Sequence, residues 1–207
     1  MNYVTLDVKT VKILAAICKD AHSRSSVNRM SFHHIYLDVV HERAVATNGH
    51  VLLMYPLGIV DSDELPINNN YPKPVPTLLP YVELLDALKL HKPGKQFLTC
   101  LENPIIGVLD GKPAVTIFQG VAPTTLFLPK TSEQYPMYEQ VFIDETREHK
   151  TVCFSAVQLA LLLKAEGKEK HYDRRVSFNI YDNAEKGATG FCTGEFSGLI
   201  MPLRQNS

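Results

Sequence analysis

The chain has 207 residues, of which 45% are hydrophobic and 21% charged, and its net charge is −1 at pH 7. This composition is ordinary for a soluble globular protein with a real core, and no apolar run approaches the about 20 residues that a membrane span needs. It also argues against DNA binding through bulk charge, unless the basic residues gather on one face. No signal peptide is evident at the N-terminus, so we expect a cytoplasmic protein without membrane contact.

The first predicted element is a helix that begins after Asp7, a residue type that caps helices well. Its apolar residues fall at core spacing: Val8, Val11, Leu14, Ala15 and Cys18. The other side carries a stripe of lysines: Lys9, Lys12 and Lys19. Such a stripe is either a solvated helix face or a surface that contacts DNA phosphates, and the sequence leaves both open.

A β region follows the helix. Residues 30–37 alternate loosely and predict a strand, and residues 43–47 and 51–55 flank Asn48-Gly49. An Asn-Gly pair between two apolar runs predicts a tight hairpin in which both turn residues adopt positive φ. Residues 56–76, with five prolines, predict a loop.

A helix followed by strands then occurs twice more, so that a unit of about 60 residues is present about three times. The expected helices cover residues 80–90 and 155–165, and the expected strands cover residues 97–101, 105–109, 114–118, 126–128, 176–181, 190–193 and 198–203. This order predicts an α+β fold with the helices on one face of antiparallel sheets.

The sequence offers little support for an enzyme or a metal protein. It contains no phosphate-binding Gly-rich loop, no Gly-x-Ser-x-Gly elbow and no His-Glu-x-x-His motif. The cysteines have no zinc-binding spacing and are expected to be free buried thiols: Cys18, Cys100, Cys153 and Cys192. We therefore expect no catalytic centre, no metal and no cofactor.

Several motifs in order resemble the bacterial DNA polymerase III β subunit, the sliding clamp. Residues 24–32 resemble its "R-x-x-L-N-G-x-x-F" strand, and 45–52 (VATNGHVL) are close to "V-A-T-D-G-H-R-L". Residues 135–141 (YPMYEQV) resemble "F/Y-P-D-Y-x-x-V", and 199–204 (LIMPLR) resemble the "V-M-P-M-R" tail. Together these matches span nearly the whole chain.

The resemblance implies a DNA-clamp fold of about one and a half clamp domains. Residues 1–145 would correspond to the middle domain, and residues 146–207 to the closing half of the third. In the family, helices line a ring around DNA, no catalytic centre exists, and partner proteins insert short peptides into an apolar cleft. Oligomers of this chain would be needed for a ring.

By the same resemblance, the peptide-binding residues would be Val27, Thr47, Gly49, His50, Val51, Leu52, Pro136, Gln140, Val141, Met201, Pro202, Leu203 and Arg204. The DNA-binding residues would be Lys9, Lys12, Lys19 and Arg24. Four positions depart from the family pattern: Asn48 replaces Asp, Val51 replaces Arg, and Glu139 and Gln140 replace basic residues.

Three functions are compatible with these features. The first is a processivity factor for DNA replication that binds polymerase or other replication proteins through peptides and encircles DNA as a homo-oligomer. The second is a clamp-like module without a ring that captures clamp-binding peptides. The third, which has less support, is an enzyme or small-ligand protein on a clamp-like fold.

Overall fold

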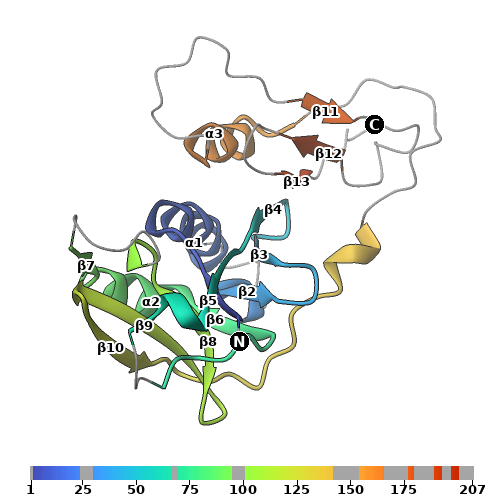
Figure 1. Cartoon of the computed structure of the whole chain (residues 1–207). Coiled ribbons are helices and arrows are strands. Elements are labelled where there is room, and N and C mark those ends of the chain that lie inside the picture. The colour runs from blue at the N-terminus through green and yellow to red at the C-terminus, as the bar shows by residue number, and fades with distance from the viewer. Residues whose placement is uncertain are drawn as a thin grey trace, which may run out of the picture.

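A computed structural model describes residues 2–23, 30–66, 70–94, 101–141, 154–165, 177–179, 189–192 and 197–200 (Figure 1). Its helices are α1 (Val8–Ser23), α2 (Tyr81–Leu88) and α3 (Ala156–Ala165), with short 3-10 helices η1 (Met30–His33), η2 (Ser62–Glu64) and η4 (Tyr138–Val141). Its strands are β1 (Asn2–Thr5), β2 (His34–Asp38), β3 (Arg43–Thr47), β4 (Val51–Pro56), β5 (Gly58–Asp61), β6 (Thr77–Pro80), β7 (Lys92–Pro93), β8 (Ile105–Leu109), β9 (Lys112–Gly120), β10 (Ala122–Phe127), β11 (Ser177–Asn179), β12 (Thr189–Cys192) and β13 (Ser197–Ile200). None of these helices has the length and apolar character that crossing a bilayer requires.

The strands form two sheets. Sheet A has the order β10-β9-β8-β1-β5, with β7 beside β9, and sheet B has the order β11-β12-β13-β4-β3-β2-β6. Every named pair is antiparallel except β7 with β9, which is parallel. Helix α1 packs against β2, β3 and β4, and α2 packs against α1, β6 and β9. The predicted α+β class is therefore confirmed.

Helix α1 forms as its sequence predicts. The Asp7 carboxylate accepts hydrogen bonds from the backbone N–H groups of Lys9 (3.1 Å) and Thr10 (2.9 Å), which satisfies two donors at the start of the helix. Leu14 and Cys18 are buried in the main core, which lies between the helices and the two sheets. The lysine-bearing side of the helix faces solvent.

Sheet B buries both of its faces, because successive side chains of a strand point to opposite sides. On β4, Val51 and Leu53 belong to the main core under α1, whereas Leu52 and Met54 belong to a second cluster on the outer face. The outer cluster also contains Val45, Tyr138 and Leu199, with Tyr36 and Tyr135 packed against it. This outer face positions the site described below.

The predicted hairpin at Asn48-Gly49 is present, since β3 and β4 are paired. The expected positive φ at both turn residues is wrong, because only Gly49 has it (φ 85°). Asn48 instead shapes the turn with its side chain: Oδ1 accepts from the backbone N–H groups of His50 (2.9 Å) and Val51 (2.8 Å). Strand β3 ends at Thr47 and β4 begins at Val51, so three residues connect the two strands.

Two local predictions need correction. The first half of the expected strand over residues 30–37 is the 3-10 helix η1, and β2 starts only at His34. His33, the last residue of η1, stacks on His22 of α1, with ring centroids 4.5 Å apart. The expected loop over residues 56–76 contains β5, whose backbone pairs with β1.

The C-terminal strands join the sheet of the same chain. β13 pairs with β4 in register from Ser197 opposite Met54 to Ile200 opposite Val51, and α3 packs against α1. The boundary predicted near residue 145 and much of the expected strand at 97–101 lie outside the described residues. The division into two domains stays a prediction.

Candidate functional site

A pocket of about 150 Å³ lies on the outer face of sheet B, where β4, the β3–β4 turn, β13 and the segment before η4 meet. Its lining is mostly apolar: Phe32, Thr47, Gly49, His50, Val51, Leu52, Pro136, Met137, Tyr138 and Leu199. Leu52, Tyr138 and Leu199 are 4–6% exposed and form the packed base, whereas Met137 is 74% exposed at the rim. A mostly apolar lining of this kind suits an apolar group of a ligand.

Six residues expected from the sequence to bind peptide line this pocket: Thr47, Gly49, His50, Val51, Leu52 and Pro136. Gln140 is exposed, does not line the pocket, and donates from its amide to Met137 Sδ at 3.1 Å. The side chain of Val141 lies outside the described part of the structure, as do Val27 and the tail residues Met201, Pro202, Leu203 and Arg204.

Sequence reasoning did not select four lining residues: Phe32, Met137, Tyr138 and Leu199. Each lies inside a motif that carried the resemblance, so the signal for them was present. Tyr138 and Leu199 fill the outer cluster of sheet B, and that role follows only once β13 is placed beside β4.

Asn48 joins the turn beside the pocket to two helices. Its Nδ2 lies 2.6 Å from Oδ2 of Asp20 on α1 and 3.2 Å from Oε1 of Gln158 on α3. Asn48 is 0% and Gln158 3% exposed, so this contact is a buried polar bridge between the turn and the C-terminal part of the chain. The amide, which departs from the Asp of the family pattern, supplies the donor that faces Asp20.

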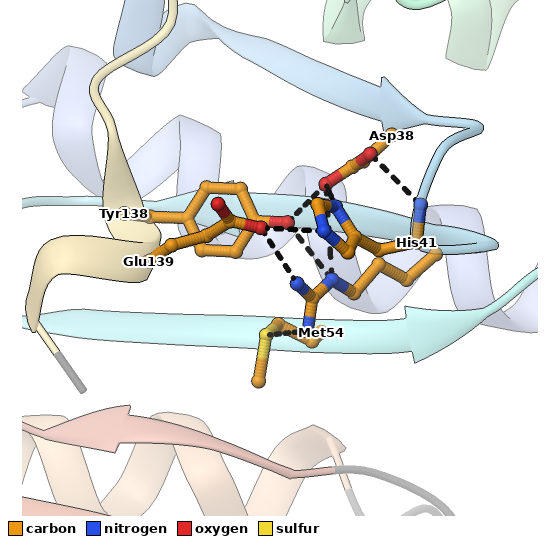
Figure 2. Close-up of polar contacts among 6 residues, drawn as sticks. Asp38, His41, Met54, Tyr138 and Glu139 are labelled. Carbon is orange, nitrogen blue, oxygen red and sulfur yellow. Dashed lines mark hydrogen bonds and ion pairs between the residues drawn. The ribbon is translucent and has the colours of Figure 1, made fainter. Parts of the chain in front are cut away.

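Figure 2 shows a group of polar side chains, here called the polar cluster, which adjoins the pocket because Tyr138 belongs to both. Its members are Asp38, His41, Arg43, Tyr138 and Glu139. Arg43 donates from Nε to Tyr138 Oη (2.8 Å) and from Nη2 to Glu139 Oε1 (3.2 Å). His41 faces Asp38 Oδ2 with Nδ1 (2.9 Å) and Glu139 Oε1 with Nε2 (3.0 Å). The Tyr138 hydroxyl donates to Asp38.

The contacts within the polar cluster set the charge states of two of its members. Burial alone would raise the pKa of Asp38, but hydrogen bonds from Tyr138 and His41 outweigh it and hold the pKa below 3.8. Burial, together with the hydrogen bond to Asp38, raises the pKa of Tyr138 above 10.0. At neutral pH Asp38 is therefore an anion, and Tyr138 keeps the proton that it donates.

Asp38, His41 and Glu139 are also the group of metal-ligand side chains in the described residues whose atoms lie within 4.8 Å of one another. The two ring nitrogens of His41 point at different carboxylates, and Arg43 already pairs with Glu139. One ion cannot take both nitrogens of one imidazole. The geometry favours a network of ion pairs over a metal site.

Three of the four residues expected to contact DNA lie on α1. Lys9, Lys12 and Lys19 are exposed, and Arg24 lies outside the described residues. The neighbouring helix α2 exposes Glu83 and Asp86, and Asp86 pairs with Lys89 at 2.6 Å. The exposed residues of these two helices thus carry both signs of charge rather than one basic surface.

Comparison with known proteins gives matches in structure alone. No protein-family model matches the chain, and no curated protein matches its sequence. Solved structures do match: the Caulobacter crescentus beta sliding clamp (TM-score 0.62, 13% identity, 98% of this chain and 65% of that chain) and the Helicobacter pylori beta clamp bound to a DNA ligase peptide (0.60, 15%, 98% and 65%). A third is the sliding clamp of Bartonella birtlesii bound to griselimycin (0.54, 15%, 99% and 66%).

This chain therefore spans about two thirds of the length of the clamps that it matches. At these identities the likeness establishes a fold and nothing finer. It covers both sheets and the helices α1, α2 and α3, since nearly the whole chain is aligned. The chain has the DNA-clamp fold of the bacterial DNA polymerase III β subunits.

Proposed function

We propose that this protein is a sliding-clamp-like factor of DNA replication that binds partner proteins through short peptides seated in the pocket on sheet B. The observation that carries the proposal is the pocket itself, which brings together six residues expected to bind peptide. The proposed role is that of a binding protein, with no catalysis of its own.

The chemistry of the pocket supports an apolar anchor residue. Leu52, Leu199 and Phe32 present hydrocarbon surface, and the exposed Met137 can adapt its side chain to different ligands. Peptides with Leu or Phe anchors are recognised in apolar grooves of this kind. The clamp of H. pylori has been crystallised with a DNA ligase peptide, which makes that peptide a suitable first probe.

Fluorescence polarisation with a labelled form of that ligase peptide tests the proposal. We expect saturable binding, no binding of a peptide whose Leu and Phe residues are replaced by Ala, and at least about tenfold weaker binding by Met137→Glu. Met137 is exposed, so this variant changes the pocket without threatening the core. Equal binding by the wild type and Met137→Glu would exclude the pocket as the site.

The proposal extends to DNA through oligomerisation. A homo-oligomer that closed into a ring would place α1 toward DNA, where Lys9, Lys12 and Lys19 can contact phosphates loosely and without sequence preference. Light scattering over a wide concentration range measures the mass. A closed oligomer supports the ring, and replacing the three lysines by Gln should then weaken DNA binding and reduce its salt dependence.

A second candidate is a clamp-like module without a ring that captures clamp-binding peptides and so modulates replication. The net charge of −1 and the acidic residues Glu83 and Asp86 on α2 favour it. A monomer at every concentration that still binds the ligase peptide would select this candidate over a processivity factor.

A further inference from the structure

One wall of the pocket is attached to sheet B by side chains. This wall consists of Pro136, Met137 and Tyr138. Among the described residues, its backbone hydrogen bonds stay local: Tyr138 N–H donates to Pro136 O (2.7 Å), and Gln140 N–H donates to Met137 O (3.2 Å). The segment belongs to neither sheet. Its distance from β4 therefore depends on side-chain contacts.

Besides the packing of the Tyr138 ring in the outer cluster, two sets of contacts hold the wall. Tyr135 stacks on Tyr36 of β2, with ring centroids 4.9 Å apart, and fixes the start of the wall. The end of the wall is held by the polar cluster, in which Tyr138 and Glu139 meet Arg43. Tyr138 belongs to both the pocket and the polar cluster, because its side chain lines the pocket and its hydroxyl donates to Asp38.

We propose that Arg43 is a positioning residue for this pocket, and that it sets the affinity for an apolar anchor without touching the ligand. Arg43 contacts Tyr138, the last residue of the wall, with Nε on its hydroxyl, and the adjoining Glu139 with Nη2 on its carboxylate. His41 contacts the same Glu139 oxygen, with Nε2 3.0 Å from Oε1. Arg43, His41 and Glu139 do not line the pocket, so we expect them to act on binding through the position of Tyr138.

The fork of the guanidinium group is essential to this role. Two donors in one plane hold Tyr138 and Glu139 in a fixed relation to β3, whereas a lysine ammonium is a single point that cannot span both with the same geometry. Arg43 also lies 3.8 Å from the Asp38 carboxylate, so its guanidinium group faces both acidic members of the polar cluster. This inference rests on the proposed peptide-binding function.

Glu139→Gln tests the proposal without disturbing the core, because the Glu139 side chain is 50% exposed. It removes the charge that pairs with Arg43, and we expect about two- to fivefold weaker binding of the labelled ligase peptide, the effect of losing one partly exposed ion pair. Glu133→Gln is the matched control, since Glu133 is an exposed glutamate of the same segment outside the polar cluster. We expect it to bind like the wild type.

Arg43→Lys separates charge from geometry. If the fork positions the wall, this variant binds as weakly as Glu139→Gln although it keeps the positive charge. Wild-type affinity in Arg43→Lys or in Glu139→Gln would overturn the proposal. Urea unfolding of each variant shows that a weaker affinity does not come from a lost fold.

Amide hydrogen exchange gives a readout that needs no ligand. We expect the amides of Tyr138 and Gln140 to exchange faster in Glu139→Gln and Arg43→Lys, with unchanged exchange in the core strand β3. If the wild type binds no peptide, the proposed function fails, but faster exchange in the two variants still supports Arg43 as the residue that positions the wall. Unchanged exchange in both variants refutes the positioning role.

Discussion

Replacing Asn48 by aspartate will put two carboxylates against each other in the turn between β3 and β4. Asn48 is 0% exposed, and its Nδ2 lies 2.6 Å from Oδ2 of Asp20. Aspartate keeps the oxygen that accepts from the backbone N–H groups of His50 and Val51, so only the contacts to Asp20 and Gln158 change. The substitution therefore isolates the amide as a donor.

Two estimates of the cost agree. Unit charges about 4 Å apart repel each other by about 4 kcal/mol at an effective dielectric constant of about 20. If one carboxyl group instead stays protonated at pH 7, its pKa must rise by about three units, which costs about 4 kcal/mol at about 1.4 kcal/mol per unit. A protonated carboxyl group then donates one hydrogen bond, so we expect a net loss of about 3–4 kcal/mol in unfolding free energy at pH 7.

Urea unfolding followed by circular dichroism measures this loss at pH 7 and pH 5. Because keeping a carboxyl group protonated costs less at the lower pH, the difference from the wild type should shrink by about 2–3 kcal/mol at pH 5. Adding Asp20→Asn to Asn48→Asp restores a donor and an acceptor, and we expect most of the stability to return. A loss under about 1 kcal/mol at pH 7, or equal losses at both pH values, would refute repulsion between the two carboxylates.

Three further outcomes follow from the fold. Gly49→Ala should cost about 1–2 kcal/mol in thermal unfolding, because Gly49 has φ 85° and an added Cβ would lie 3.3 Å from Cε2 of Phe32; an unchanged Tm contradicts this. Leu53→Ala should cost about 2–5 kcal/mol in urea unfolding, because Leu53 is 1% exposed in the main core; a loss below about 1 kcal/mol would mean that the site collapses around the smaller side chain. The pKa of Asp38 lies below 3.8 in the folded chain, so its ionised carboxylate stabilises the fold at pH values above its pKa in the unfolded chain. This contribution is lost as the pH falls through the lower pKa of the folded chain. The difference in unfolding free energy between the wild type and Asp38→Asn should therefore shrink below about pH 4, and a constant difference from pH 7 to pH 3 argues against it.

The sequence predicts best where a local signal is strong. The spacing of Leu14 and Cys18, with Asp7 as the cap, was sufficient for α1. The strand expected at residue 30 was wrong because Phe32, Ile35 and Leu37 mimic alternation across a 3-10 helix and a strand. β5 was not predicted, because the surrounding prolines indicate a loop and the strand pairs with β1, which is distant in the sequence.

The pocket and the polar cluster differ in how far the sequence could predict them. The pocket residues on β3 and β4 lie within one motif, so its family resemblance predicts them together. The polar cluster has no such signal, because Asp38 and Arg43 are ordinary charged residues until Glu139, 96 positions after Arg43, is placed beside them. Contacts between segments so distant in the chain appear only in the folded structure.

The pairing of β13 with β4 couples two equilibria, namely the docking of the C-terminal strands on sheet B and the binding of a ligand in the pocket. Leu199 on β13 belongs to the pocket, so the pocket is complete only while the C-terminal strands are docked on sheet B. Any ligand that needs Leu199 must then favour the docked state, and at about 100 times its Kd it would add about 2.7 kcal/mol to the stability of docking. By the same linkage, a change that loosens the C-terminal strands weakens ligand binding even when no residue in contact with the ligand has changed.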